Sequence, residues 1–516
     1  MRKEGFLYGA LILAIVNFIV RILGFSYKII LSKLIGPEGI GLFQMVFPVL
    51  MIFITITTAG IPIAVSKLVA KQNSIGNQQG VKKVFRMSLL IVLLLAILLD
   101  IVIIIFGKFI SWEILNNKDI YPSILTLAPA ILIISLSSTV RGYFYGLKNI
   151  TPAGIAQILE QIVRIGFVLG IIYYLYPVSP KLGAFIAVCG ISVGELFGFL
   201  WLLVNYRLNK RNKKQNTTSH KISSIKALSS ICYIAVPITI SRIVNVTLHM
   251  INAILIPQRL MVAGYSNSDA IAIFGRVTGM TMPLIFLPFI VTSALVINII
   301  PNLSEEMELK NYRLIKNNIT LSIRITLIIS IPLSFIYIFL GNPIAMFFYN
   351  DTLVGKYVEI MGYATLFLSL QHTLSGILHG LGKQVITTIN YIIGMSFQVL
   401  AIYFLVGNPR FGINGFFIGF IISSILISLL HFITLKKILP IKLNIINSIL
   451  KPLFSSLVSI VLTGITYKYF SNVYTGKLLP LLFSFSLGGI SYFAILFLIK
   501  GLPPYLFRKI FNLKNK

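Results

Sequence analysis

Four polar or small residues recur at helical spacing inside the first apolar segment, residues 6–31: Asn17, Arg21, Gly24 and Lys28. Positions three or four apart lie on one face of a helix, so this helix has a polar face. A cation at the centre of a membrane-spanning helix costs about 2.5–3.5 kcal/mol on insertion scales, and it therefore faces protein or water and marks a functional site. The planar guanidinium of arginine suits phosphate, which it binds in bidentate fashion.

Two further apolar segments carry polar stripes of the same kind. In residues 153–176 the stripe includes Glu160 and Arg164, which stand four residues apart and could equally well neutralise each other as bind a ligand. In residues 227–256 it includes His249, which could be a buried helix contact or a proton carrier. The full stripes are Gln157, Glu160, Gln161 and Arg164 in the first segment, and Arg242, Asn245, His249 and Asn252 in the second.

Cations outnumber acids in the apolar segments. Arg276 and Arg324 lie toward the ends of their segments, where a long side chain can extend to the headgroup region. Because three acids cannot pair six cations, the surplus predicts a ligand that carries negative charge. The acids are Asp100, Glu160 and Glu195, and the cations are Arg21, Lys28, Arg164, Arg242, Arg276 and Arg324.

The elements that position these residues are membrane-spanning helices. Of 516 residues, 57% are hydrophobic and 11% charged, and apolar runs of about 20 residues, long enough for a hydrocarbon core of about 30 Å, recur to the C-terminus. We predict an all-α polytopic membrane protein with 14 transmembrane helices. The expected spans are 6–31, 40–66, 85–107, 122–146, 153–176, 182–206, 227–256, 270–300, 317–340, 354–380, 384–406, 412–435, 446–470 and 478–499.

The net charge of +31 is explained by topology. If both termini and every second loop share one side, that side holds most of the 44 lysines and arginines, so the positive-inside rule places both termini in the cytoplasm of a cell-membrane protein. Anionic lipid, and not nucleic acid, is the expected partner of these basic loops. No phosphate-binding loop, zinc motif or disulfide framework is present, so we expect no enzyme activity, no cofactor and no metal.

The chain contains an internal duplication. Gly142 and Gly146 pair with Gly376 and Gly380 at an offset of 234 residues, and Pro48 pairs with Pro283 at 235. Six spans per copy give a parallel repeat, the arrangement of two-lobed alternating-access transporters. The predicted domains are an N-terminal lobe of spans 1–6 at residues 1–206, a basic cytoplasmic linker at 207–226, a C-terminal lobe of spans 7–12 at 227–440, and two appended spans with a basic cytoplasmic tail at 441–516.

Two stretches carry a resemblance to a known family. Arg21-Ile-Leu-Gly-Phe25-Ser-Tyr27-Lys28, followed by Ile35-Gly-Pro-Glu-Gly39, resembles the opening of the stage V sporulation protein B family, and residues 279–305 resemble its eighth span. This family belongs to the polysaccharide and oligosaccharidyl-lipid flippase branch of the multidrug/oligosaccharidyl-lipid/polysaccharide exporter superfamily. In lipid II flippases a second basic residue follows the Leu-Gly-Phe motif by two positions; here Tyr27 occupies that position and Lys28 follows it.

The resemblance implies a flippase that carries a polyprenyl-pyrophosphate-linked saccharide, such as lipid II for spore cortex peptidoglycan, from the cytoplasmic to the outer leaflet. The expected partners are this substrate and membrane lipids. A multidrug exporter of the same superfamily and a non-transporting scaffold for cell-wall or spore assembly are the alternatives. The candidate substrate-binding residues are Asn17, Arg21, Lys28, Glu160, Arg164, Arg242, Asn245, His249 and Arg276.

Overall fold

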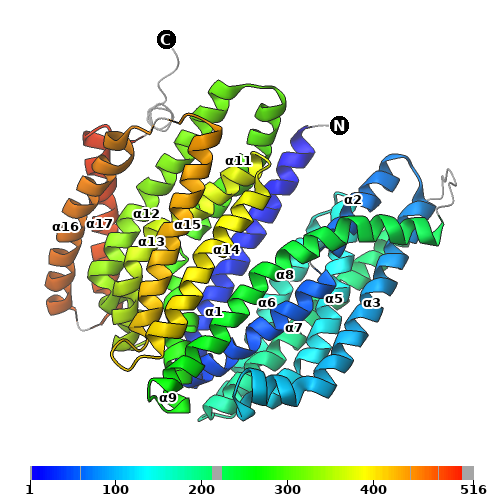
Figure 1. The fold of residues 1–516 in the computed structure, drawn as a ribbon, viewed down its shortest axis with the longest axis horizontal. Helices are drawn as coiled ribbons and strands as arrows, with labels where there is room; N and C mark the ends of the chain where they lie inside the picture. The colour runs from blue at the N-terminus through cyan, green and yellow to red at the C-terminus, as the bar shows by residue number, and fades with distance from the viewer. Residues whose placement is uncertain (1–2, 59, 212–222, 442, 475, 503–516) are drawn as a thin grey trace. The chain divides into compact units, whose positions relative to one another are not determined.

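The fold is described from a computed structural model, and throughout its described part it consists of helices without a β-strand (Figure 1). Among the described residues, eleven helices are long and apolar enough to cross a membrane, or twelve if Asn267–Ile285 and Phe289–Glu308, bent by 58° at their break, form one span. The prediction of a multi-pass membrane protein is confirmed. The structure describes residues 3–58, 60–211, 223–441, 443–474 and 476–502, and side chains are not considered for residues 3–14, 209–211, 241, 244 and 245.

The chain divides into two compact units, of which unit 1 comprises Met1–Met261 and Tyr265–Gly275. Its main core lies between α2, α3, α5 and α7, where the side chains of Val65, Phe85 and Phe144 are buried. The helices of this unit are α1 (Lys3–Thr58), α2 (Ile61–Ser74), α3 (Gln78–Phe109), α4 (Tyr121–Leu125), α5 (Leu127–Gly146), α6 (Thr151–Tyr174), α7 (Pro180–Arg211), α8 (Ser224–Val262) and α9 (Asn267–Gly275), with short turns η1 (Ile110–Ile114) and η2 (Lys118–Ile120).

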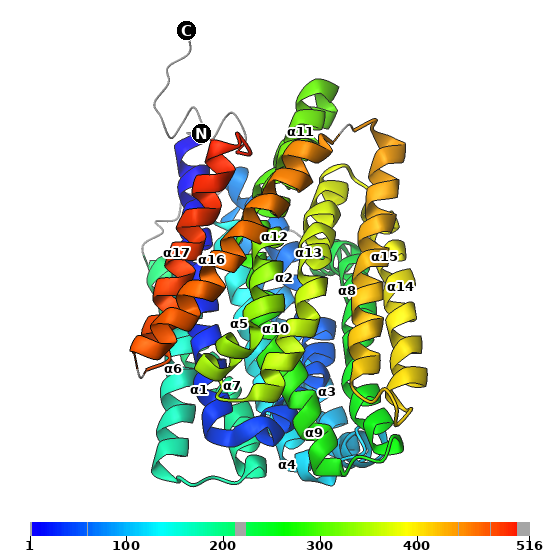
Figure 2. The same cartoon turned by 90° about the vertical axis from the view of Figure 1, so that its left-hand side faces the viewer.

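Unit 2 comprises Val262–Gly264 and Arg276–Lys516. Its main core lies chiefly between α11, α12, α13 and α15, and α16 packs on α17 and on α12 along one edge of the unit (Figure 2). The elements of this unit are η3 (Arg276–Thr281), α10 (Met282–Ile285), α11 (Phe289–Glu308), α12 (Tyr312–Phe348), α13 (Thr352–Gly380), α14 (Gln384–Ala401), η4 (Ile402–Val406), α15 (Asn414–Ile438), η5 (Ile446–Leu450), α16 (Lys451–Val473) and α17 (Leu478–Leu498).

The first two expected spans are joined in one long helix in the structure. Helix α1 runs continuously through the first expected span and most of the second, broken only at Gly36, which has φ +71° directly before Pro37. A left-handed residue followed by proline interrupts the helical hydrogen bonds, so the two spans meet at a kink instead of a loop. Each of the 14 expected ranges falls on helix, while the number of spans stays a prediction.

The unit boundary falls later than the predicted lobe boundary. The compact units divide at Arg276, which leaves α8 and α9 in unit 1, whereas the sequence places the division in the linker at 207–226. Most of this linker lies outside the described residues. The lobe and linker boundaries therefore stay a prediction.

Packing within the two units agrees with the predicted duplication at two pairs of glycines. In unit 1, a Cβ on Gly142 would lie 2.9 Å from the Cα of Pro62, and one on Gly146 would lie 2.8 Å from the Cβ of Val69. In unit 2, the positions 234 residues later make the same contacts, Gly376 with Val296 and Gly380 with Leu303. Close helix approach at matched glycines explains the repeated spacing. The arrangement α2 on α5 and α6 on α7 likewise recurs as α11 on α13 and α14 on α15.

Candidate functional site

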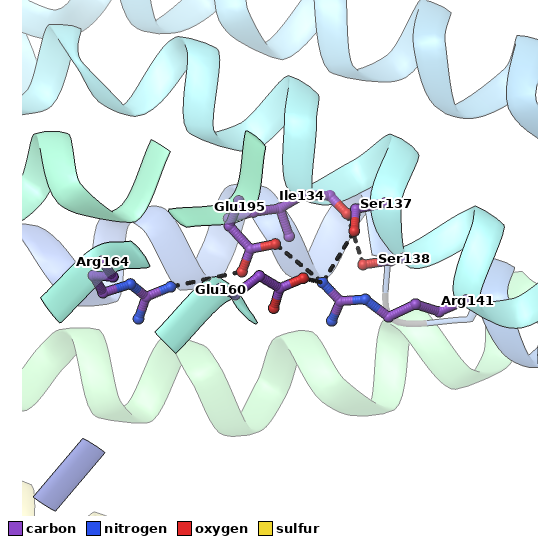
Figure 3. Close-up of polar contacts among 7 residues, drawn as sticks. All are labelled: Ile134, Ser137, Ser138, Arg141, Glu160, Arg164 and Glu195. Carbon is purple, nitrogen blue, oxygen red and sulfur yellow. Dashed lines mark hydrogen bonds and ion pairs between the residues drawn. The ribbon is translucent and has the colours of Figure 1, made fainter. Parts of the chain in front are cut away.

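Four charged side chains from three helices of unit 1 meet in the interior of the bundle (Figure 3). Arg141 of α5 donates one hydrogen bond to Glu160 of α6 at 2.5 Å and another to Glu195 of α7 at 3.1 Å. It also donates to the hydroxyl of Ser137, at 3.0 Å, one turn earlier on α5. Arg141 therefore bridges two carboxylates that the chain separates by 35 positions.

The fourth member, Arg164 of α6, lies 3.7 Å from the second oxygen of Glu195. The order of charges is thus Glu160, Arg141, Glu195, Arg164, and we call these four residues the charged cluster. Glu160 and Arg164 do not pair with each other along α6, because each finds its partner on a neighbouring helix. The ion pair within α6 that their spacing allowed is replaced by ion pairs between helices, Glu160 with Arg141 and Arg164 with Glu195.

Three glycines of α7 make room for the cluster. These glycines occur at every fourth position of α7 and face residues at every fourth position of α6, in the opposite chain direction. The pairs are Gly190 with Val168, Gly194 with Arg164, and Gly198 with Glu160. A Cβ on Gly198 would collide with the carboxylate of Glu160, and one on Gly194 would lie 3.0 Å from the Cβ of Arg164. Small residues on one face let the two backbones approach, which fixes the charged side chains between them.

Helix α1 runs parallel to α6 beside the cluster. Two contacts fix how α1 lies along α6: Val16 contacts Gly154, and Tyr27 interacts electrostatically with Arg164. The contacts are eleven positions apart on α1 and ten on α6. Arg21, between Val16 and Tyr27, therefore lies beside the residues of α6 just before Glu160. The buried hydroxyl of Tyr27 has no hydrogen-bond partner among the described residues.

The other predicted residues of α1 differ in exposure. Asn17 and Arg21 are exposed, whereas Lys28 is half-buried and makes no ion pair with a carboxylate in the part of the chain that the structure describes. The polar face predicted for residues 6–31 thus extends from an exposed end into the protein, on the helix that packs against α6 and α7.

The predicted stripe on α8 is only partly described. Arg242 and His249 both belong to unit 1 and are exposed. The side chain of Asn245 lies outside the described residues. The role of this stripe in ligand binding remains a prediction.

Two predicted cations of unit 2 have partners that the sequence did not indicate. Arg276 donates from Nε to Asp351 at 2.7 Å, and Asp351 also caps α13 by accepting from the backbone N–H of Leu353 at 2.8 Å. Arg324 donates to the backbone carbonyl of Gly501 at 2.7 Å, just after α17 ends. Arg276 therefore has a carboxylate partner that the count of embedded acids did not include, and its assignment to substrate binding remains a prediction.

Arg141 is the residue that sequence reasoning missed. It lies near the inner end of the expected span 122–146, where a cation is ordinarily counted with the headgroup region. The signal that could have found it is the run of Ser137, Ser138 and Thr139 within the preceding turn, because hydroxyl groups at this depth indicate a helix face turned toward protein. Among the described residues, no group of three or more His, Cys, Asp or Glu could hold a metal ion.

The chain is similar to curated proteins of Bacillus subtilis (strain 168). It is 29% identical to stage V sporulation protein B over 86% of this chain and 86% of that protein. It is 26% identical to the lipid II flippase MurJ over 76% of each chain. The fold matches a solved structure described as "Lipid II flippase MurJ, inward closed conformation", with a TM-score of 0.68 and 16% identity over 93% of this chain and 97% of that one.

Two family descriptions match the sequence. Residues 237–404 match the MatE family. Residues 6–307, more than half of the chain, match the family described as polysaccharide biosynthesis protein. The protein therefore belongs to the polysaccharide biosynthesis protein family.

Proposed function

We propose that this protein is a flippase that moves a polyprenyl-pyrophosphate-linked saccharide from the cytoplasmic to the outer leaflet of the cell membrane by alternating access. The observation that supports this most directly is the state of Arg164, which lies partly exposed in the interior of a membrane-spanning bundle. Its carboxylate partner, Glu195, lies 3.7 Å from its guanidinium group. A guanidinium with free donors suits the pyrophosphate of such a lipid. In this proposal both termini are cytoplasmic, and the substrate is a peptidoglycan precursor such as lipid II for the spore cortex.

The relatives support the same substrate class. The names stage V sporulation protein B and lipid II flippase MurJ belong to proteins that match most of this chain. The exposed cations Arg21 and Arg242 of unit 1 then contribute to headgroup capture, together with Asn17, Lys28 and His249 on the same two helices. Asn245 remains a candidate from the sequence pattern alone.

The test measures flipping of fluorescent lipid II by the purified full-length protein in liposomes. Arg21→Ala and Arg242→Ala are expected to reduce the flipping rate while both proteins remain membrane-inserted. Arg313→Ala, which removes an exposed arginine at the start of α12, is the matched control. Flipping at the wild-type rate in both test variants would contradict the assignment of these cations.

The MatE match over residues 237–404 favours a second candidate, a multidrug exporter. Organic cations call for binding sites in which acids outnumber bases, and the charged cluster has two of each. Drug efflux in a sensitised host, with no flipping of lipid II, would support this alternative. Absence of both activities would instead favour a membrane scaffold.

A further inference from the structure

Arg164, the last residue of the charged cluster, has the fewest and longest contacts with carboxylates. Arg141 contacts two carboxylates, whereas Arg164 contacts only Glu195, and their 3.7 Å separation is the longest of the three ion pairs in the cluster. The Arg164 side chain is also the most exposed of the four, at 19%. Its buried Nε has no hydrogen-bond partner among the described residues. Arg164 therefore has hydrogen-bond donors left over for a ligand.

The duplication shows that the helix packing does not require these charges. At the offset of 234 residues, Arg141, Glu160 and Arg164 correspond to Ser375, Gly394 and Gln398, and at the offset of 232 that relates Gly183 to Gly415, Glu195 corresponds to Ile427. In unit 2 the glycine and isoleucine positions pack directly against each other. The same helix pair is thus held by an apolar contact in one copy and by ions in the other.

Because helix packing does not require the charged cluster, its charges need an explanation other than stability. Burying ions is costly, and an apolar replacement of similar volume is often as stable or more so. The cluster is therefore retained for what its charges do. In a protein that binds an anion, the arginine must also be neutralised when the anion is absent, since an uncompensated guanidinium at bilayer depth is costly.

We propose that Glu195 acts as an internal counter-anion of the substrate site: it pairs with Arg164 in the empty protein and gives way there to the pyrophosphate of the substrate. This inference rests on the proposed function. After the exchange, Glu195 keeps its other oxygen on Arg141, at 3.1 Å. The exchange therefore breaks only the 3.7 Å contact.

The resident carboxylate also sets a threshold for the ligand. A group that displaces Glu195 must attract Arg164 more strongly than one carboxylate does. A lipid pyrophosphate carries more negative charge than a lipid monophosphate, and it offers more oxygens to a bidentate guanidinium. Displacing Glu195 costs every anionic lipid the same free energy, so Glu195 weakens the binding of both lipids by one factor and leaves only the more strongly attracted pyrophosphate lipid bound at low concentration. It also lets the empty protein return without an uncompensated Arg164.

The experiment measures binding of undecaprenyl pyrophosphate and undecaprenyl monophosphate to the full-length protein in nanodiscs. Glu195→Gln keeps the shape of the side chain and removes its charge. We expect about two- to fivefold tighter binding of both lipids, by the same factor for each, the range for loss of one partly exposed competing ion pair. Glu306→Gln is the matched control, because Glu306 is half-buried on α11, where it accepts a hydrogen bond from Asn318 and contacts no member of the charged cluster, and no tightening is expected.

A second readout separates this role from a merely structural one. In liposomes, Glu195→Gln is expected to slow net flipping of fluorescent lipid II, since the empty protein must return with Arg164 uncompensated. Exchange between leaflets that both contain lipid II does not require that return and is expected to be retained. If Glu195→Gln does not fold, Glu195→Asp lengthens the contact with Arg164 and is expected to tighten binding by a smaller factor.

Unchanged or weaker binding of undecaprenyl pyrophosphate by the folded variant would overturn the proposal. Equal loss of net flipping and exchange would overturn it as well, because that pattern indicates general damage. If the wild-type protein binds neither lipid, the proposed function itself fails. If the wild-type protein binds the lipids and Glu195→Gln binds them with the same affinity, only the role proposed for Glu195 fails.

Discussion

Gly41 of α1 and Gly275, the last residue of α9, meet so closely that a Cβ on Gly275 would lie 2.9 Å from the Cα of Gly41. The two glycines are 234 positions apart, which is the offset of the duplication (275 − 41 = 234). Two positions that the predicted duplication makes equivalent therefore contact each other.

Substitution of Gly275 tests this contact. Gly275→Ala is expected to destabilise the protein by about 1–3 kcal/mol, because the new methyl group would overlap the backbone of Gly41 and Pro37. Thermal unfolding of the detergent-solubilised protein measures the change. Gly170→Ala in α6, where a Cβ would meet nothing within 4 Å, is the control and should leave the unfolding temperature unchanged or raise it. Equal effects of the two substitutions would contradict the close contact.

The fold class was predictable because membrane-spanning helices satisfy their own backbone and need only long apolar runs, which the sequence displays directly. The kink at Gly36 was less visible. Glycine followed by proline predicts a turn between two spans, whereas the structure continues the helix on both sides of one left-handed residue. Local sequence marks the break but does not fix the angle, which depends on the helices packed around it.

The sequence indicated three members of the charged cluster, Glu160, Arg164 and Glu195, but it did not indicate Arg141 or any of the pairs. The helical spacing of Glu160 and Arg164 correctly placed both on one face, but the partners of Arg141 and Arg276 come from distant positions. Asp351 lies 75 residues from Arg276, and Glu195 lies 54 residues from Arg141. A count of embedded charges on single helices cannot anticipate such pairs, because tertiary packing decides which helices meet.

Removal of Arg141 tests the stability of the charged cluster. Arg141→Ala leaves Glu160 and Glu195 in the bundle with only Arg164 nearby, and it is expected to destabilise the protein by about 3 kcal/mol. Folding in membranes can be measured from the fraction of monodisperse protein after extraction and from its thermal unfolding. A change below about 1 kcal/mol would indicate that the carboxylates are neutralised by protonation and not by Arg141.

A quadruple substitution separates folding from function at the same cluster. Arg141→Ser, Glu160→Gly, Arg164→Gln and Glu195→Ile install the residues that the second copy carries at Ser375, Gly394, Gln398 and Ile427. Because that copy packs its helices without ions, we expect the quadruple variant to be more stable than Arg141→Ala and to flip no fluorescent lipid II. Flipping at the wild-type rate would show that the cluster has no part in transport.

The pair Arg276 and Asp351 provides a double-mutant cycle in unit 2. Asp351→Asn keeps an oxygen that can cap α13 but loses the charge, whereas Asp351→Ala loses both and should cost about 1 kcal/mol more. Arg276→Gln should match Asp351→Asn in stability, and the double variant should be no worse than either, since both remove the same 2.7 Å contact. Additive losses would show that the two side chains stabilise the protein separately.

Dependence on membrane potential tests what charge crosses the membrane. If a pyrophosphate moves outward with its negative charge, an inside-negative potential favours export by about 2.3 kcal/mol per charge per 100 mV, which is about fiftyfold in the equilibrium ratio between leaflets. Liposomes with a valinomycin-imposed potassium gradient allow the ratio of fluorescent lipid II to be measured at either sign of the potential. We expect accumulation in the outer leaflet to increase when the inside is negative and to decrease when the sign is reversed. A ratio that does not respond would mean that a cation accompanies each pyrophosphate, so that the anion does not move as net charge.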